Sequence, residues 1–225
     1  MCSFKLMPGI LIILISAVQV GYGADITEKE IKDFKVEQGS FFGLCGNIEV
    51  PCGYFMVNGD HSTNPNTKVK KTSLSHGTVR EVLNAVVKNN PDYQWSNEDG
   101  VINIVPKQNH KHLEKGADPL SRIIKKVEVS SVGADEAAQR IAIASGLPLG
   151  GRIIVSGRRH SATVSFKLSK VTLRQALNAL VKADGMAVWV LEYDQMHNKY
   201  IISVYPWRKG WTAPFCLNRI SVSLG

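Results

Sequence analysis

Histidine and serine side chains are the groups in this sequence that could do acid–base chemistry. His76, His160 or His197 could act as the general base of a Ser-His-acid triad, which assembles in space without a fixed spacing in sequence. No serine lies in an activating motif, and the chain has no HExxH, Walker or GxGxxG motif. His110 and His112 lack a third metal ligand nearby. We expect no enzymatic activity, no cofactor and no metal, with a small hydrolase built from dispersed Ser, His and Asp residues as the alternative.

A compact basic turn could bind anions. Arg158, Arg159 and His160 follow Gly157 between two expected strands, and Arg152 lies close by in the sequence. The chain carries 27 Lys and Arg residues against 19 Asp and Glu residues, a formal net charge of +8. Such a turn predicts contact with an anionic envelope polymer, or it is simply a solvated loop. We expect no nucleic acid as a partner, because no GXXG loop follows a helix.

Two polar stripes recur at helical spacing. In each, an arginine, an asparagine and a lysine spaced by four residues share one face of an expected helix. The residues are Arg80, Asn84 and Lys88 in the first stripe, and Arg174, Asn178 and Lys182 in the second. The occurrence of all three in both stripes predicts a docking surface for a protein partner, although recent duplication would explain it equally well.

The helices that carry these stripes belong to an internal repeat. Residues 74–88 match residues 168–182 at nine of fifteen positions, and at the same offset Trp95 corresponds to Trp189. Each segment contains a threonine capping box and has apolar residues at i, i+3, i+4 and i+7. We therefore expect one face of each helix to lie in a core, which the two tryptophans close.

The strand and helix patterns around the repeat give the order βαββαββ. In the second copy we expect strands at 126–129, 152–155, 163–168, 187–192 and 200–205, and a first helix at 134–145. The first copy is more degenerate, because Gly43 and Gly46 interrupt its first helix at 40–47. The sequence thus predicts an α+β fold of two tandem modules related by internal duplication. The expected divisions are a signal peptide 1–23, a first module 24–106, a linker 107–121, a second module 122–206 and a tail 207–225.

The N-terminus has the pattern of a secretory signal peptide. Lys5 precedes an apolar run at 10–17, and Gly21 and Gly23 place small residues before a cut at Ala24. A retained membrane anchor is the alternative, but that needs about 20 apolar residues. We expect export to the periplasm or the extracellular space, with no transmembrane segment after processing.

Export would allow the cysteines to form disulfides, because disulfides persist in oxidising compartments. Removal of Cys2 leaves Cys45, Cys52 and Cys216, an odd number. We predict a Cys45–Cys52 disulfide, since the two are close in sequence across a loop that contains glycine. Pairing of either one with Cys216, or three unpaired thiols, stays open.

Residues 164–186 resemble the short N-terminal domain shared by secretins and TonB-dependent receptors. An extended segment with Phe166 leads into the capped helix that begins near Leu173, as in that family. The resemblance covers most of residues 122–206, and it extends to residues 34–106 through the internal repeat. It implies the βαββαββ order and a habit of docking onto other envelope proteins.

The resemblance implies no catalytic residue, and the chain has too few residues for the channel or receptor part of those families. We therefore expect an exported, non-enzymatic interaction module of the bacterial cell envelope, which docks onto an envelope or secretion-system protein. The hydrolase and the protein that binds an anionic polymer stay as alternatives.

Overall fold

The computed structural model describes residues 25–36, 41–57, 72–107, 118–148, 163–185, 187–194 and 197–206. We call residues 25–107 the first half and residues 118–206 the second half. The elements of the first half are η1 (Ile26–Glu28), β1 (Glu30–Val36), α1 (Phe41–Ile48), β2 (Cys52–Val57), β3 (Thr72–Thr78), α2 (Val79–Asn89), β4 (Tyr93–Glu98) and β5 (Val101–Pro106). Those of the second half are η4 (Pro119–Ser121), β6 (Ile123–Val132), α3 (Ala134–Ser145), β7 (Val164–Thr172), α4 (Leu173–Asp184), β8 (Ala187–Asp194) and β9 (Lys199–Pro206).

Local sequence signals explain where the helices begin and end. Complete capping boxes start α2 at Thr78 and α4 at Thr172, so both expected boxes are confirmed. Gly146 and Gly185 end α3 and α4 in the left-handed conformation that glycine adopts without strain. The α+β class and the helix expected at 134–145 are therefore confirmed.

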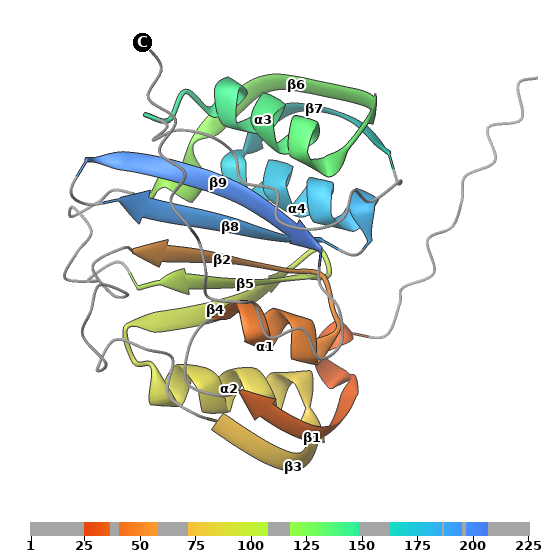
Figure 1. The fold of residues 1–225 in the computed structure, drawn as a ribbon, viewed down its shortest axis with the longest axis vertical. Coiled ribbons are helices and arrows are strands. Elements are labelled where there is room, and N and C mark those ends of the chain that lie inside the picture. Colours follow the sequence, from red (N-terminus) through yellow and green to blue (C-terminus); the bar gives the residue numbers. More distant parts are fainter. Residues whose placement is uncertain are drawn as a thin grey trace, which may run out of the picture.

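One five-stranded sheet contains strands from both halves. Its order is β4-β5-β2-β8-β9, and β2 runs parallel to both β5 and β8. Figure 1 shows this sheet across the middle of the molecule, with α1, α2, β1 and β3 at one end and α3, α4, β6 and β7 at the other. The first half therefore joins the second by strand pairing, from Cys52 opposite Val188 to Val57 opposite Tyr193.

The two faces of the shared sheet lie in two different cores. Along β8, Val188 and Val190 belong to the core of the first half, whereas Trp189 and Leu191 belong to the core of the second half. Successive residues of a strand point to opposite faces, so this alternation assigns one face to each half. Both expected helix faces are buried in these cores, through Val79, Val82, Leu83 and Val86 in α2 and Leu173, Ala176, Leu177 and Leu180 in α4.

A two-stranded antiparallel ribbon accompanies the helices of each half. β1 pairs with β3 and contacts α1, while β6 pairs with β7 and contacts α3. In the first half the Val79 amide donates to the Lys29 carbonyl at 2.9 Å, and in the second half the Leu173 amide donates to the Arg122 carbonyl at 2.8 Å. These equivalent contacts show that the halves are built alike; their origin by duplication stays a prediction.

Several expectations concern residues outside the described ranges. They are the signal peptide, the strand at 152–155, the basic turn with Arg152, Arg158, Arg159 and His160, the residues His110 and His112, and Cys216. Within the described ranges, no helix is both long enough and apolar enough to cross a membrane.

Candidate functional site

The disulfide joins the middle of α1 to the start of β2. Cys45 and Cys52 are bonded with their Cα atoms 5.8 Å apart, which confirms the expected pairing. Both side chains are buried in the core of the first half. The bond fixes the start of β2. Gly53 follows Cys52 on this strand, and the contact between the halves depends on Gly53.

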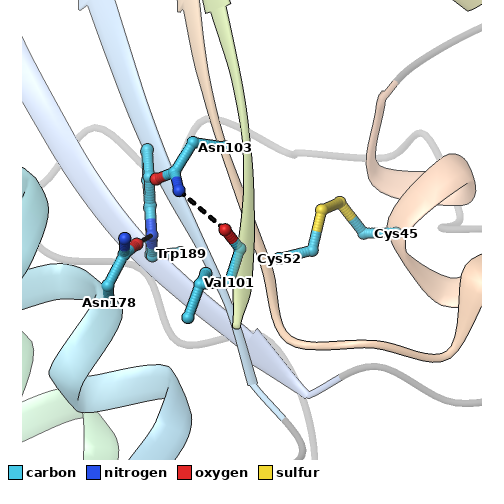
Figure 2. The surroundings of a disulfide bond; sticks show 6 residues. All are labelled: Cys45, Cys52, Val101, Asn103, Asn178 and Trp189. Carbon is cyan, nitrogen blue, oxygen red and sulfur yellow. Dashed lines mark hydrogen bonds between the residues drawn. A yellow bond between two sulfur atoms is a disulfide. The ribbon is translucent and has the colours of Figure 1, made fainter. Parts of the chain in front are cut away.

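Trp189 closes the core of the second half over the backbone of the first. Its indole Nε1 donates to Asn178 Oδ1 at 2.8 Å, and both side chains are buried. Gly53 lies opposite Trp189 in the β2–β8 pair, and a Cβ atom added to Gly53 would overlap the indole ring. Figure 2 shows Trp189 between Asn178 and the strand of Cys52. A glycine on β2 is therefore required by the tryptophan on β8.

Asn103 is a buried polar residue near this contact (Figure 2). Its amide donates to the Val101 carbonyl at 2.9 Å. Its Oδ1 atom is buried and accepts no hydrogen bond from the part of the chain that the structure describes. Nothing in its sequence neighbourhood indicated that this asparagine would be buried.

The polar stripe of α4 contacts the first half of the same chain. Arg174 Nη1 lies 2.6 Å from Glu98 Oε1, and Lys182 Nζ donates to the Asp99 carbonyl at 2.8 Å. Arg174 also lies 3.6 Å from Asp118, at the start of the second half. Arg174, Asn178 and Lys182 thus bind the β4–β5 turn and Trp189 within the molecule.

The stripe of α2 repeats only part of this arrangement. Trp95 Nε1 donates to Asn84 Oδ1 at 3.0 Å, as Trp189 does to Asn178, but Trp95 is half-buried and Asn84 is exposed. An open groove of about 440 Å³ lies beside them. Its lining consists of Asn84, Val87, Lys88, Pro91, Tyr93, Gln94, Trp95 and Lys107. The groove therefore has a tryptophan wall and two lysines, without an acidic side chain in its lining.

Arg80 is held at the N-terminal end of α2. It lies 3.0 Å from Asp25 and 2.8 Å from Glu28, and the Thr27 hydroxyl accepts from it at 2.6 Å. The hydrogen bond with Glu28 raises the pKa of Arg80, and the backbone amide of Thr27 lowers the pKa of Asp25. Arg80 thus ties α2 to η1, and Lys88 is the charged member of the first stripe that lines the groove.

Two histidines, His76 and His197, lie in the described ranges, and neither lines the groove beside Trp95. His197 Nδ1 lies 2.7 Å from Asp194 Oδ2 at the end of β8, where His197 is exposed and Asp194 is half-buried. His76 lines a second hollow of about 200 Å³ between β1 and β3, with Glu30 and Glu81 but no serine. The described ranges contain no group of three or more His, Cys, Asp or Glu side chains placed to hold a metal ion.

The hydrogen bond between tryptophan and asparagine was not predicted from the sequence, although the repeat contains a signal for it. Asn84 precedes Trp95 by eleven residues, and Asn178 precedes Trp189 by the same number. An asparagine that recurs at a fixed distance from a tryptophan in both copies indicates a hydrogen bond between the amide and the indole. The expectation that the tryptophans close a core is confirmed for Trp189, which is buried; the half-buried Trp95 packs against the core of the first half and also lines the groove.

Comparison with known proteins does not place the chain in a family. No family model, no curated protein and no solved structure matches it.

Proposed function

We propose that this chain is an exported, non-enzymatic interaction protein of the bacterial cell envelope, which binds an extended segment of an envelope protein at the outer edge of β4. The groove beside Trp95 carries this proposal, because the equivalent surface of the second half binds a strand. There, Trp189 lies over β2 and Lys182 binds a main-chain carbonyl.

β4 is suited to such binding because it is the last strand of the sheet in the described ranges. Glu98 and Val101 pair across a two-residue turn, in which Asp99 and Gly100 have positive φ angles. Hydrogen-bonded and non-hydrogen-bonded pairs alternate along an antiparallel ladder. Trp95 and Asn97 therefore direct their main-chain groups away from β5, toward an added strand.

Other observations support the compartment. The apolar run before Ala24 is typical of a signal peptide, and the Cys45–Cys52 bond fits an oxidising environment. The resemblance of residues 164–186 to secretin and TonB-receptor modules points to the same compartment. An anionic polymer at the basic turn of Arg158 and Arg159 stays a second proposal.

Photo-crosslinking in intact envelopes tests the proposal. A photoreactive residue in place of Lys88 should crosslink to an extended peptide of an envelope protein, because Lys88 lines the groove and is exposed. The same residue in place of Lys125, which is exposed on β6 at the other end of the molecule, should not.

Charge reversal supplies a matched comparison. Lys88→Glu with Lys107→Glu should reduce crosslinking about tenfold from a probe placed at Gln94, another residue of the groove. Lys125→Glu with Lys126→Glu changes the net charge equally on β6 and should leave it unchanged. Equal crosslinking from positions 88 and 125, or equal loss in both double variants, would contradict the proposed function.

A further inference from the structure

The contact between the halves shows which kind of strand fits beside a tryptophan of this fold. β2 runs parallel to β8, and Gly53 of β2 is the register partner of Trp189. The indole lies across this position, since a Cβ atom added to Gly53 would overlap the ring. The strand that binds beside Trp189 is thus parallel to β8 and has a glycine opposite the tryptophan.

The surface that receives β2 occurs again at β4. The indole of Trp95 donates to an asparagine eleven residues before it on the preceding helix, as the indole of Trp189 does. The two rings are therefore held in the same way between a strand and a helix. Beside Trp189 the edge of β8 is paired with β2, whereas beside Trp95 the groove is open and β4 ends the sheet in the described ranges. A strand added to β4 would meet the Trp95 ring as β2 meets the Trp189 ring.

The charges beside α2 differ between its two ends. Arg80, in the first turn, is paired with Asp25 and Glu28 of the same half. Lys88, in the last turn, lines the groove together with Lys107, and the lining contains no acidic side chain. In the second half, the lysine equivalent to Lys88 donates to a main-chain carbonyl of the β4–β5 turn. The groove therefore favours an acidic segment at the end of α2 that leads into β4.

The direction of the added strand places its acidic residues relative to its glycine. In a strand parallel to β4, the residues before the glycine lie beside the residues before Trp95. These are Tyr93 and Gln94, which line the groove together with Lys88 and Lys107. Acidic side chains on the N-terminal side of the glycine therefore lie near both lysines, whereas acidic side chains after the glycine lie farther along β4.

We propose that the segment bound at β4 is a parallel strand in which acidic residues precede a glycine, with the glycine opposite Trp95 and the acidic side chains toward Lys88 and Lys107. The proposal rests on the function proposed above, and it names the sequence class and the direction of the partner segment. A larger residue in place of the glycine would overlap the indole, and this overlap excludes other strands.

Short synthetic peptides test this pattern with the purified full-length protein. The reference peptide is a strand of valine and threonine residues in which two glutamates precede a glycine, with a fluorescent label at its C-terminus. Fluorescence anisotropy should show that it binds about tenfold more tightly than a peptide with valine in place of the glycine. It should also bind about tenfold more tightly than a peptide with the glutamates moved behind the glycine. This second control keeps the composition and the charge, so it isolates the direction of the strand.

Protein variants locate the binding at the groove. Trp95→Ala should abolish the preference for glycine over valine, because the ring that excludes valine is gone. Circular dichroism checks that this variant folds, since Trp95 packs against the core of the first half. Lys88→Glu changes an exposed residue, and it should weaken binding of the reference peptide about tenfold. Lys125→Glu, on β6, is the matched control and should leave binding unchanged.

Equal affinities for the glycine and valine peptides, or no measurable binding of the reference peptide, overturn the inference. These results come from the unaltered protein, so they decide the matter even if Trp95→Ala does not fold. The proposed function would then still stand if a photoreactive residue at position 88 crosslinks in intact envelopes to an extended segment that lacks this pattern. Absence of that crosslink would instead contradict the proposed function.

Discussion

Gly53 has no side chain, and this allows Trp189 of the second half to pack against β2 of the first half. Gly53 is the second residue of β2, in a buried, parallel strand pair, where glycine ordinarily weakens a strand. The indole of Trp189 lies where its Cβ atom would be, so the tryptophan fills the missing volume. A conformational explanation is not needed, because Gly53 is not among the glycines with positive φ.

We predict that Gly53→Val lowers the free energy of unfolding by about 2 kcal/mol or more, because it overpacks the contact with Trp189. Denaturant unfolding followed by circular dichroism measures the change. Trp189→Leu should cost stability by itself, and it should cost less in the Gly53→Val background, since the smaller side chain leaves room for valine. Additive losses in the double variant would show that the two residues do not compete for the same volume.

At the scale of elements, the helices were more predictable than the strand partners. Capping boxes and helix-ending glycines act over a few residues, and each is visible in the sequence. The poor helix expected at 40–47 nevertheless forms as α1, because Leu44, Cys45 and Ile48 are buried and the disulfide at Cys45 ties the helix to β2. Tertiary packing here outweighs the cost of Gly43 and Gly46.

Strand pairing between the halves could not be predicted from the sequence. The repeat suggested two separate modules, and nothing local to β2 or β8 indicates that they are neighbours. Both are apolar on both faces, which is typical of a buried parallel strand without specifying its partner. The same holds for the candidate site, because the groove beside Trp95 depends on which strand ends the sheet.

We predict that Thr172→Ala lowers the free energy of unfolding by about 1 kcal/mol, because it removes the side chain that caps α4. Chemical denaturation measures this loss. Thr172→Ser keeps the hydroxyl oxygen and should retain most of the stability, while Thr78→Ala should cost a similar amount at α2. A Thr172→Ser variant as unstable as Thr172→Ala would show that packing of the methyl group, and not the cap, is responsible.

At the scale of the whole molecule, the shared sheet should make unfolding a single event. Its three inner strands, β5, β2 and β8, carry residues of both cores. If either core unfolds, one face of these three strands becomes exposed to solvent. The other core then loses stability, because it is built on the opposite face of the same strands. Two modules joined only by a linker would instead unfold independently.

We predict that Leu177→Asp, which places a carboxylate in the core of the second half, destabilises both halves by more than about 4 kcal/mol. Amide hydrogen exchange should then show lost protection in α2 and β5 of the first half, as well as in α4. Ala183→Asp, on the exposed face of α4, is the control and should have little effect. Protection of α2 that survives in Leu177→Asp would show that the halves are independent.

The parallel pairing of β2 with β8 also governs the order in which the chain can fold. Cys52 and Val188 are paired although more than half of the chain lies between them. During synthesis from the N-terminus, β5 can join β2 early, but the opposite edge of β2 has no partner until β8 has been made. An unpaired strand edge can pair with strands of other chains, and pairing of two strands that are so far apart in sequence is slow. The rate at which β8 arrives therefore sets how long a nascent chain is exposed to misassembly.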